Sequence, residues 1–167
     1  SNLHRERMNE KVLEKLQSNF PDSILMTNEF RGDLTVTLKK DDIIKVCRFL
    51  RDDEDLRFDS IRDIVGVDRY RPENRFELVY NLYSLVNNHR IFLKVLVEEQ
   101  DLKVPTVVGV WSGANWMERE AFDMFGIAFE GHPDARRIYM PEEFEHFPLR
   151  KDFPLMGIPG SLYLPPK

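Results

Sequence analysis

Apolar positions in the first forty residues follow first a helical and then a strand spacing. In residues 5–20 they recur every three to four positions, which predicts an amphipathic helix that ends before Pro21. Residues 23–28 predict a short strand. Residues 34–38 alternate apolar with polar side chains, as a half-buried strand does, and residues 30–33 between the two strands predict a turn.

A second helix is expected after these strands, with Asp41 as its cap. Its apolar face would consist of Ile43, Val46, Cys47 and Leu50. Because the single cysteine, Cys47, lies on this face, we expect a buried and unreactive thiol. The acidic residues 52–55 that follow are most simply a solvated loop.

The middle of the chain is rich in strand patterns. Residues 61–70, 75–86 and 90–98 each predict a strand, and the last two show apolar side chains on both faces. Asn87 and Asn88 between them favour a hairpin, since asparagine tolerates the positive φ of tight turns. These strands predict a mixed or antiparallel sheet covered by helices on one face and partly covered on the other. With the flanking helices, the fold class is α+β.

Residues 115–125 predict a short helix of unusual composition. Asn115 and Glu118 have the spacing of a capping box, and Gly126 is placed to end the helix in the left-handed conformation. Arg119 and Asp123 are four residues apart and can pair. Apolar residues surround these charges and leave almost no polar face: Trp116, Met117, Ala121, Phe122, Met124 and Phe125. We therefore expect the helix to be covered nearly all round and its charges to be partly buried.

The C-terminal part has the composition of an extended arm. Seven of the ten prolines lie from Pro133 onward, and proline at this density excludes long helices and central strands. The segment nevertheless carries many large apolar residues, which need a surface to lie on. The sequence therefore predicts an α+β domain over residues 1–127 and an extended, proline-rich arm over residues 128–167 that docks on a partner.

Composition excludes several classes of function. A net charge of −5 disfavours nucleic-acid binding, and one cysteine cannot form an iron–sulfur cluster or a disulfide within the chain. The sequence contains none of the common nucleotide-binding, hydrolase or metalloprotease motifs, so we expect no catalytic, cofactor-binding or metal-binding residues. His132 and His146 are interpreted as exposed or interface histidines. A stand-alone hydrolase that uses Glu118, Glu120 and His132 is a competing hypothesis.

The chain shows no segment suited to a membrane. The longest uncharged stretch, residues 104–117, is short and interrupted by proline and glycine, and the first residues do not form a signal peptide. We therefore expect a protein kept in the cytoplasm, held at a membrane only through other chains.

Three motifs in the second half resemble the 30 kDa (C-type) subunit family of respiratory complex I. The first is SGANWMEREAFDMFGI at residues 112–127, the second is FEGHPD followed by RRI at residues 129–138, and the third is PLRKDFPL at residues 148–155. Together they cover about residues 108–157 strongly. Gly113 departs from the serine that the resemblance leads us to expect.

The resemblance implies a non-catalytic member of NADH:quinone oxidoreductase. Such a protein supports electron transfer from NADH to quinone, coupled to proton translocation, by assembling chiefly against the D and B subunits, with the I subunit as a further candidate neighbour. It binds no cofactor, because FMN and the iron–sulfur clusters lie in partner subunits, and it is peripheral on the cytoplasmic side of the inner membrane. The alternative is the equivalent component of a membrane-bound hydrogenase, formate hydrogenlyase or another complex I-like dehydrogenase.

A charge network is expected to fix the arm in such a protein. Replacing Arg119 or Glu120 by alanine would strand a buried partner and cost about 3–5 kcal/mol. The interface and network residues predicted in this way are Glu118, Arg119, Glu120, Asp123, Arg136, Arg137, Pro148, Arg150, Lys151 and Asp152.

Overall fold

A five-stranded mixed sheet forms the centre of the molecule. The computed structural model describes residues 1–133. The strands are β1 (Ile24–Phe30), β2 (Asp33–Leu38), β3 (Ser60–Asp68), β4 (Phe76–Ser84) and β5 (His89–Val97), in the order β1-β2-β5-β4-β3. All neighbours are antiparallel except β2 and β5, which run parallel. This confirms the predicted α+β class with a mixed sheet.

Both predicted hairpin turns form, and each contains a residue type that favours positive φ, Gly32 in one and Asn88 in the other. The turn between β1 and β2 places Arg31 at φ 53° and Gly32 at φ 84°. The turn between β4 and β5 spans residues 85–88 and places Asn88 at φ 47°. Asparagine tolerates this region because its short polar side chain bonds the local backbone.

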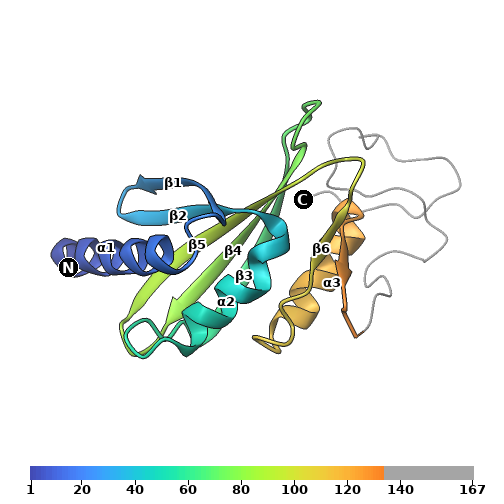
Figure 1. Cartoon of the computed structure of the whole chain (residues 1–167). Helices are drawn as coiled ribbons and strands as arrows, with labels where there is room; N and C mark the ends of the chain where they lie inside the picture. Colours follow the sequence, from blue (N-terminus) through green and yellow to red (C-terminus); the bar gives the residue numbers. More distant parts are fainter. Residues whose placement is uncertain (134–167) are drawn as a thin grey trace, which may run out of the picture.

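One face of the sheet carries the core. Cross-strand partners Leu82 and Ile91, and Tyr80 and Leu93, point to the same side because side chains alternate along each strand. Helices α1 (Asn2–Asn19), α2 (Ile43–Asp52) and α3 (Ala114–Phe125) add buried residues to this same cluster. Figure 1 shows α1 and α2 beside the strands, with α3 near the end of β3. No helix in residues 1–133 therefore covers the opposite face of the sheet.

The start of α2 differs from the sequence-based expectation. Asp41 lies inside a short 3₁₀ turn, η1 (Lys40–Asp42), and Asp42 occupies the N-cap position without a side-chain hydrogen bond. The predicted cap at Asp41 is thus wrong, because the chain enters the helix through a tighter turn. The predicted apolar face of α2 is buried throughout, and burial raises the pKa of the Cys47 thiol well above its usual range, which keeps the thiol protonated.

The acidic residues after α2 are only partly solvated. Asp53 receives two hydrogen bonds from the Lys15 ammonium group of α1, at 2.9 and 3.0 Å, and accepts bonds from the backbone N–H groups of Asp55 and Leu56. Asp52 is the last residue of α2, and Asp53 links the end of α2 to α1 through Lys15, so the expectation of a simple solvated loop is wrong for Asp53.

A small second sheet lies beside α3. Strand β6 (Lys103–Pro105) pairs in parallel with β7 (Ala128–Glu130), so the segments before and after α3 are joined. The predicted boundary between residues 127 and 128 remains a prediction, and the arm beyond Pro133 lies outside the described residues.

Candidate functional site

Helix α3 contains the charged motif and ends as predicted. Gly126 has φ 81°, and its N–H bonds the carbonyl of Phe122 at 2.8 Å, a left-handed C-cap that an L-residue would adopt only with strain. The predicted capping box is wrong. The helix begins at Ala114, with Gly113 at the N-cap position and no side-chain cap, so Asn115 is already inside the first turn.

Glu118 instead points into the protein and is completely buried. One carboxyl oxygen accepts the hydroxyl of Thr106. The other accepts the backbone N–H of Val107 at 2.8 Å. Thr106 and Val107 directly follow β6, so this carboxyl group attaches α3 to the small second sheet.

Burial raises the pKa of Glu118 to about 7, even though the hydrogen bonds from Thr106 and Val107 favour the charged form. The Glu118 charge also raises the pKa values of the Cys47 thiol and the Tyr80 hydroxyl, for both of which burial is the larger cause. Three buried groups on α2, β4 and α3 therefore share one apolar environment.

His132 lies against the same helix. Its Nε2 is 3.1 Å from the carbonyl oxygen of Asn115 and 3.9 Å from a carboxyl oxygen of Glu118, and its side chain is 3% exposed. His132 is therefore not an exposed histidine, because the turn after β7 folds it onto the first turn of α3. The hydrolase hypothesis grouped His132 with Glu118, but no spacing in the sequence indicated that they meet, because the pairing of β6 with β7 brings the two together.

The remaining predicted network residues of α3 lie on different faces of the helix. Asp123 is completely buried, and the Arg119 guanidinium lies 5.5 Å from the ring centre of Trp116. Glu120 and Trp116 are exposed, so the expectation that α3 is covered nearly all round does not hold within the described residues. Within residues 1–133, Glu120 is therefore not buried, and its predicted contacts with the arm remain predictions.

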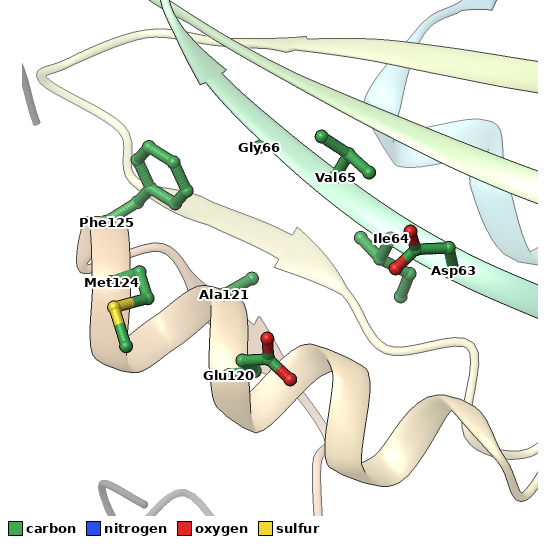
Figure 2. A pocket seen from close by; sticks show the side chains of 8 residues that line it. All are labelled: Asp63, Ile64, Val65, Gly66, Glu120, Ala121, Met124 and Phe125. Carbon is green, nitrogen blue, oxygen red and sulfur yellow. The ribbon is translucent and has the colours of Figure 1, made fainter. Parts of the chain in front are cut away.

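Glu118 and Glu120 do not form a pair of catalytic carboxyl groups. They are two residues apart, so they project from opposite sides of the helix. Glu118 faces the second sheet, whereas Glu120 lines a hollow of about 220 Å³ beside β3. Figure 2 shows Glu120 and Met124 on α3 with Asp63 across from them. The arrangement required by the hydrolase hypothesis, in which Glu118, Glu120 and His132 converge, is not present.

A second buried charge cluster was not recognised in the sequence. Arg75 donates two hydrogen bonds, each 2.9 Å long, to the two carboxyl oxygens of Asp68, and both side chains are nearly inaccessible. Arg75 also binds Glu99 at 2.9 Å. Next to this cluster, Glu77 binds Arg69 and Arg71, each at 3.1 Å. The sequence signal was the density of arginine in residues 69–75, but only the β3–β4 register shows which carboxylates they meet.

The other predicted network residues lie outside the described residues. They are Arg136, Arg137, Pro148, Arg150, Lys151 and Asp152. Their predicted contacts with α3 remain predictions.

The described residues show neither a metal-binding cluster nor a membrane-spanning helix. Residues 1–133 contain no cluster of three or more His, Cys, Asp or Glu side chains that could hold a metal ion. None of the helices in this part of the chain is long and apolar enough to cross a bilayer.

The fold and the site define a class: an α+β module whose motif-bearing helix is tied to a small second sheet through a buried carboxyl group. The family described as "Respiratory-chain NADH dehydrogenase, 30 Kd subunit" matches residues 36–159. The chain belongs to this family of complex I subunits.

Curated relatives carry the same assignment. The C subunit of NADH-quinone oxidoreductase from Roseiflexus sp. (strain RS-1) is 54% identical over 147 residues, which are 88% of this chain and 84% of that protein. The C subunit of the same enzyme from Geotalea uraniireducens (strain Rf4) is 46% identical over 149 residues, which are 89% of this chain and 90% of that protein.

Solved structures share the fold. The trypsin-resistant fragment (1-134) of Nqo5 is 35% identical, with a TM-score of 0.64 over 76% of this chain and 98% of that one. A chain of the membrane-bound sulfane sulfur reductase, an archaeal respiratory membrane complex, has a TM-score of 0.73 over 88% of this chain and 86% of that one. At 24% identity, this second likeness concerns the fold alone.

Proposed function

We propose that this chain is a non-catalytic peripheral-arm component of NADH:quinone oxidoreductase. It supports electron transfer from NADH to quinone, coupled to proton translocation, by assembling against the D and B subunits. The observation that carries this proposal is that Glu118 accepts hydrogen bonds from Thr106 and Val107 inside the protein. The carboxyl group of the family motif whose pKa is raised therefore holds structural elements together and does not face a substrate.

The chemistry of the chain supports a role without a resident cofactor. An iron–sulfur cluster needs several thiolate ligands, and the whole sequence contains one cysteine, whose thiol is buried and protonated. We therefore propose that FMN and the clusters reside in partner subunits. The chain would lie on the cytoplasmic side of the membrane and be held there through the complex.

The α+β part and the arm have separate roles in this proposal. Residues 1–127 form the rigid body, and residues 128–167 run along a partner subunit. The basic residues Arg136, Arg137 and Arg150 would meet carboxylates of α3 or of the partner. This assignment rests on the apolar and proline-rich composition of the segment.

Co-purification from native membranes tests the proposal. The tagged full-length chain is recovered from detergent-solubilised membranes, the co-purifying proteins are identified, and NADH:quinone activity is assayed. Recovery of the D and B subunits with this activity is the expected result. Recovery with a hydrogenase or formate-oxidising module would assign the chain to a related complex, and recovery of the chain alone would overturn the proposal.

A further inference from the structure

Within the described part of the chain, the outer edge of β3 has backbone hydrogen-bonding groups that no other strand engages. Within the described residues, β3 pairs only with β4 and forms one border of the sheet. The N–H of Arg69 bonds the carbonyl of Arg75 at 2.8 Å, one position beyond the last strand pair, Asp68 and Phe76. Because backbone groups of an antiparallel strand alternate between its two sides, Val65 and Val67 bond β4, while Ile64 and Gly66 direct N–H and C=O groups outward.

The hollow beside β3 lies along this same edge. It has a volume of about 220 Å³, and β3 and α3 form its walls. Ile64 and Gly66, whose outward backbone groups lie on this edge, are among its lining residues. Figure 2 shows α3 and β3 as the two sides, with Phe125 next to Gly66.

The chemistry of the hollow selects one kind of occupant. Its charged lining groups are both acidic: Asp63 at the end near the β-bulge and Glu120 on α3. Its remaining side chains are apolar, and Val65 on the neighbouring sheet face is 47% exposed. An extended peptide supplies the missing backbone partners, and a lysine or arginine on it meets the two carboxylates.

In the described residues, positions 64–67 of β3 carry none of the sequence devices that usually protect a border strand. Residues 64–67, Ile-Val-Gly-Val, carry no charge and no proline. The bulge between Ile61 and Asp63 lies before this stretch and leaves it regular. Ile64 and Gly66 together offer two donors and two acceptors, which suffice for a short added strand.

We infer that the outer edge of β3 receives an extended, basic segment of a neighbouring protein of the complex as a sixth strand. The inference rests on the proposed function for the origin of the segment, and it goes further by naming the edge and the chemistry of the partner. The occupant contacts the hollow through a lysine or arginine between Asp63 and Glu120.

Amide hydrogen exchange in the intact complex tests the added strand. In the isolated full-length chain, the amides of Ile64 and Gly66 exchange quickly, because they face outward. In the co-purified complex they should exchange at least about a hundredfold more slowly, as ladder amides do. The amides of Val65 and Val67 bond β4 in both states and serve as the internal control.

Crosslinking identifies the occupant. The variant Val65→p-benzoylphenylalanine is assembled into the complex, irradiated and digested, and Met26→p-benzoylphenylalanine on the opposite border strand is the control, since Met26 is 62% exposed. A crosslink from position 65 to a partner segment containing lysine or arginine supports the inference. The double variant Asp63→Lys, Glu120→Lys should then lower the yield about tenfold.

The outcomes separate this inference from the proposed function. If the chain co-purifies with the other proteins of complex I but the amides of Ile64 and Gly66 remain fast, the inference is overturned and the proposed function stands. A crosslink only to residues 134–167 of the same chain, or none, also overturns it. If the chain is recovered without partners, both are overturned.

Discussion

At the scale of single residues, the ionisation of Glu118 should change stability with pH. The pKa of its carboxyl group is about 7 in the folded protein, against an ordinary value of 4.5. Between these values the folded state holds a proton that the unfolded state has lost, so this group lowers the free energy of unfolding as pH rises from 4.5 to 7. The upper limit of this loss is roughly 3 kcal/mol.

His89 has the opposite effect over much of the same range. Burial is the main cause that lowers its pKa from 6.5 to about 4, and its Nε2 lies 2.8 Å from the side-chain oxygen of Asn9. The unfolded state therefore binds the extra proton, and this group lowers stability as pH falls from 6.5 toward 4. Between pH 4.5 and 6.5 the two groups change the free energy of unfolding in opposite directions. The contribution of Glu118 therefore cannot be read from the pH dependence of the wild type alone.

The comparison with Glu118→Gln isolates the effect of Glu118. Glutamine does not titrate, so the free energy of unfolding of the variant relative to wild type should rise steadily between pH 4.5 and 7 and level off above. Urea unfolding at several pH values measures this difference. A difference that does not change with pH would show that Glu118 does not hold its proton in the folded state.

Tyr80 offers a second prediction at this scale. Its hydroxyl is buried and has no hydrogen-bond partner in the structure of residues 1–133. Removing the hydroxyl with Tyr80→Phe should raise the free energy of unfolding by about 1 kcal/mol, because burying an unpaired polar group is unfavourable. Loss of stability in urea unfolding would instead reveal an ordered water on this hydroxyl.

At the scale of elements, the contact of α3 with β3 depends on a missing side chain. A Cβ atom added at Gly66 would lie 2.5 Å from Cε2 of Phe125. Gly66→Ala should therefore force the Phe125 ring or the helix to move and cost about 1–3 kcal/mol in denaturant unfolding. Gly109→Ala is the matched control, since a Cβ there meets nothing within 4 Å.

The double variant Gly66→Ala, Phe125→Leu tests the cause. If the clash with the ring is responsible, the two changes together should cost less than the sum of their separate costs. Additive costs would show that Gly66→Ala destabilises the protein through the β3 backbone and not through a clash with the Phe125 ring.

The pair of Asp68 and Arg75 fastens the hairpin of β3 and β4 at the end where the loop of residues 69–75 joins the two strands. Arg75→Met should cost about 3–5 kcal/mol, because it leaves a buried carboxylate without its bidentate partner. The control Arg71→Met removes an arginine whose side chain is 42% exposed, and it should change stability little because Glu77 keeps Arg69 as a partner. Equal unfolding midpoints for the two variants would contradict this account.

At the scale of the whole molecule, replacing Glu118 should affect the stability of the chain, whereas replacing Glu120 should affect its assembly into the complex. Glu118→Ala leaves the hydroxyl of Thr106 and the N–H of Val107 without an acceptor and should destabilise the isolated chain by about 1–3 kcal/mol. Glu120→Ala removes an exposed side chain and should change this stability by less than about 0.5 kcal/mol. Its effect should appear in the yield of the assembled complex.

Thermal melting of the isolated variants and recovery of the complex measure the two effects. If Glu120→Ala gives the same yield of assembled complex as the wild type, Glu120 is not part of the predicted interface. A normal melt with Glu118→Ala would contradict the structural role of its hydrogen bonds.

Much of the fold could be predicted because the spacing of apolar and turn residues over short stretches of sequence determines it. The helix of residues 5–20, the two hairpins and the left-handed Gly126 each depend on neighbours within a few positions. The partners of Glu118 could not be predicted in this way. Thr106 and His132 lie 12 and 14 residues away, and only the pairing of β6 with β7 brings them to the helix.

The capping errors have a related cause. Asp41 and Asn115 both have side chains suited to capping a helix. Asp41 lies inside a 3₁₀ turn before α2, and Asn115 lies inside α3 because that helix begins one residue earlier. Helix ends depend on how the chain arrives from the preceding element, which spacing within the helix does not encode.

The parallel pairing of β2 with β5 also affects the chain during its synthesis. Residues 39–88 separate the two strands, and a ribosome adding about 5–20 residues per second needs about 3–10 s to make them. Throughout that interval the β1–β2 hairpin has no neighbouring strand and exposes Leu25, Met26 and Phe30, which stay exposed even in the finished structure. Nascent chains on one messenger RNA therefore expose the same apolar hairpin to each other and can associate through it. Protection by a chaperone would matter most before residue 97 has left the ribosome.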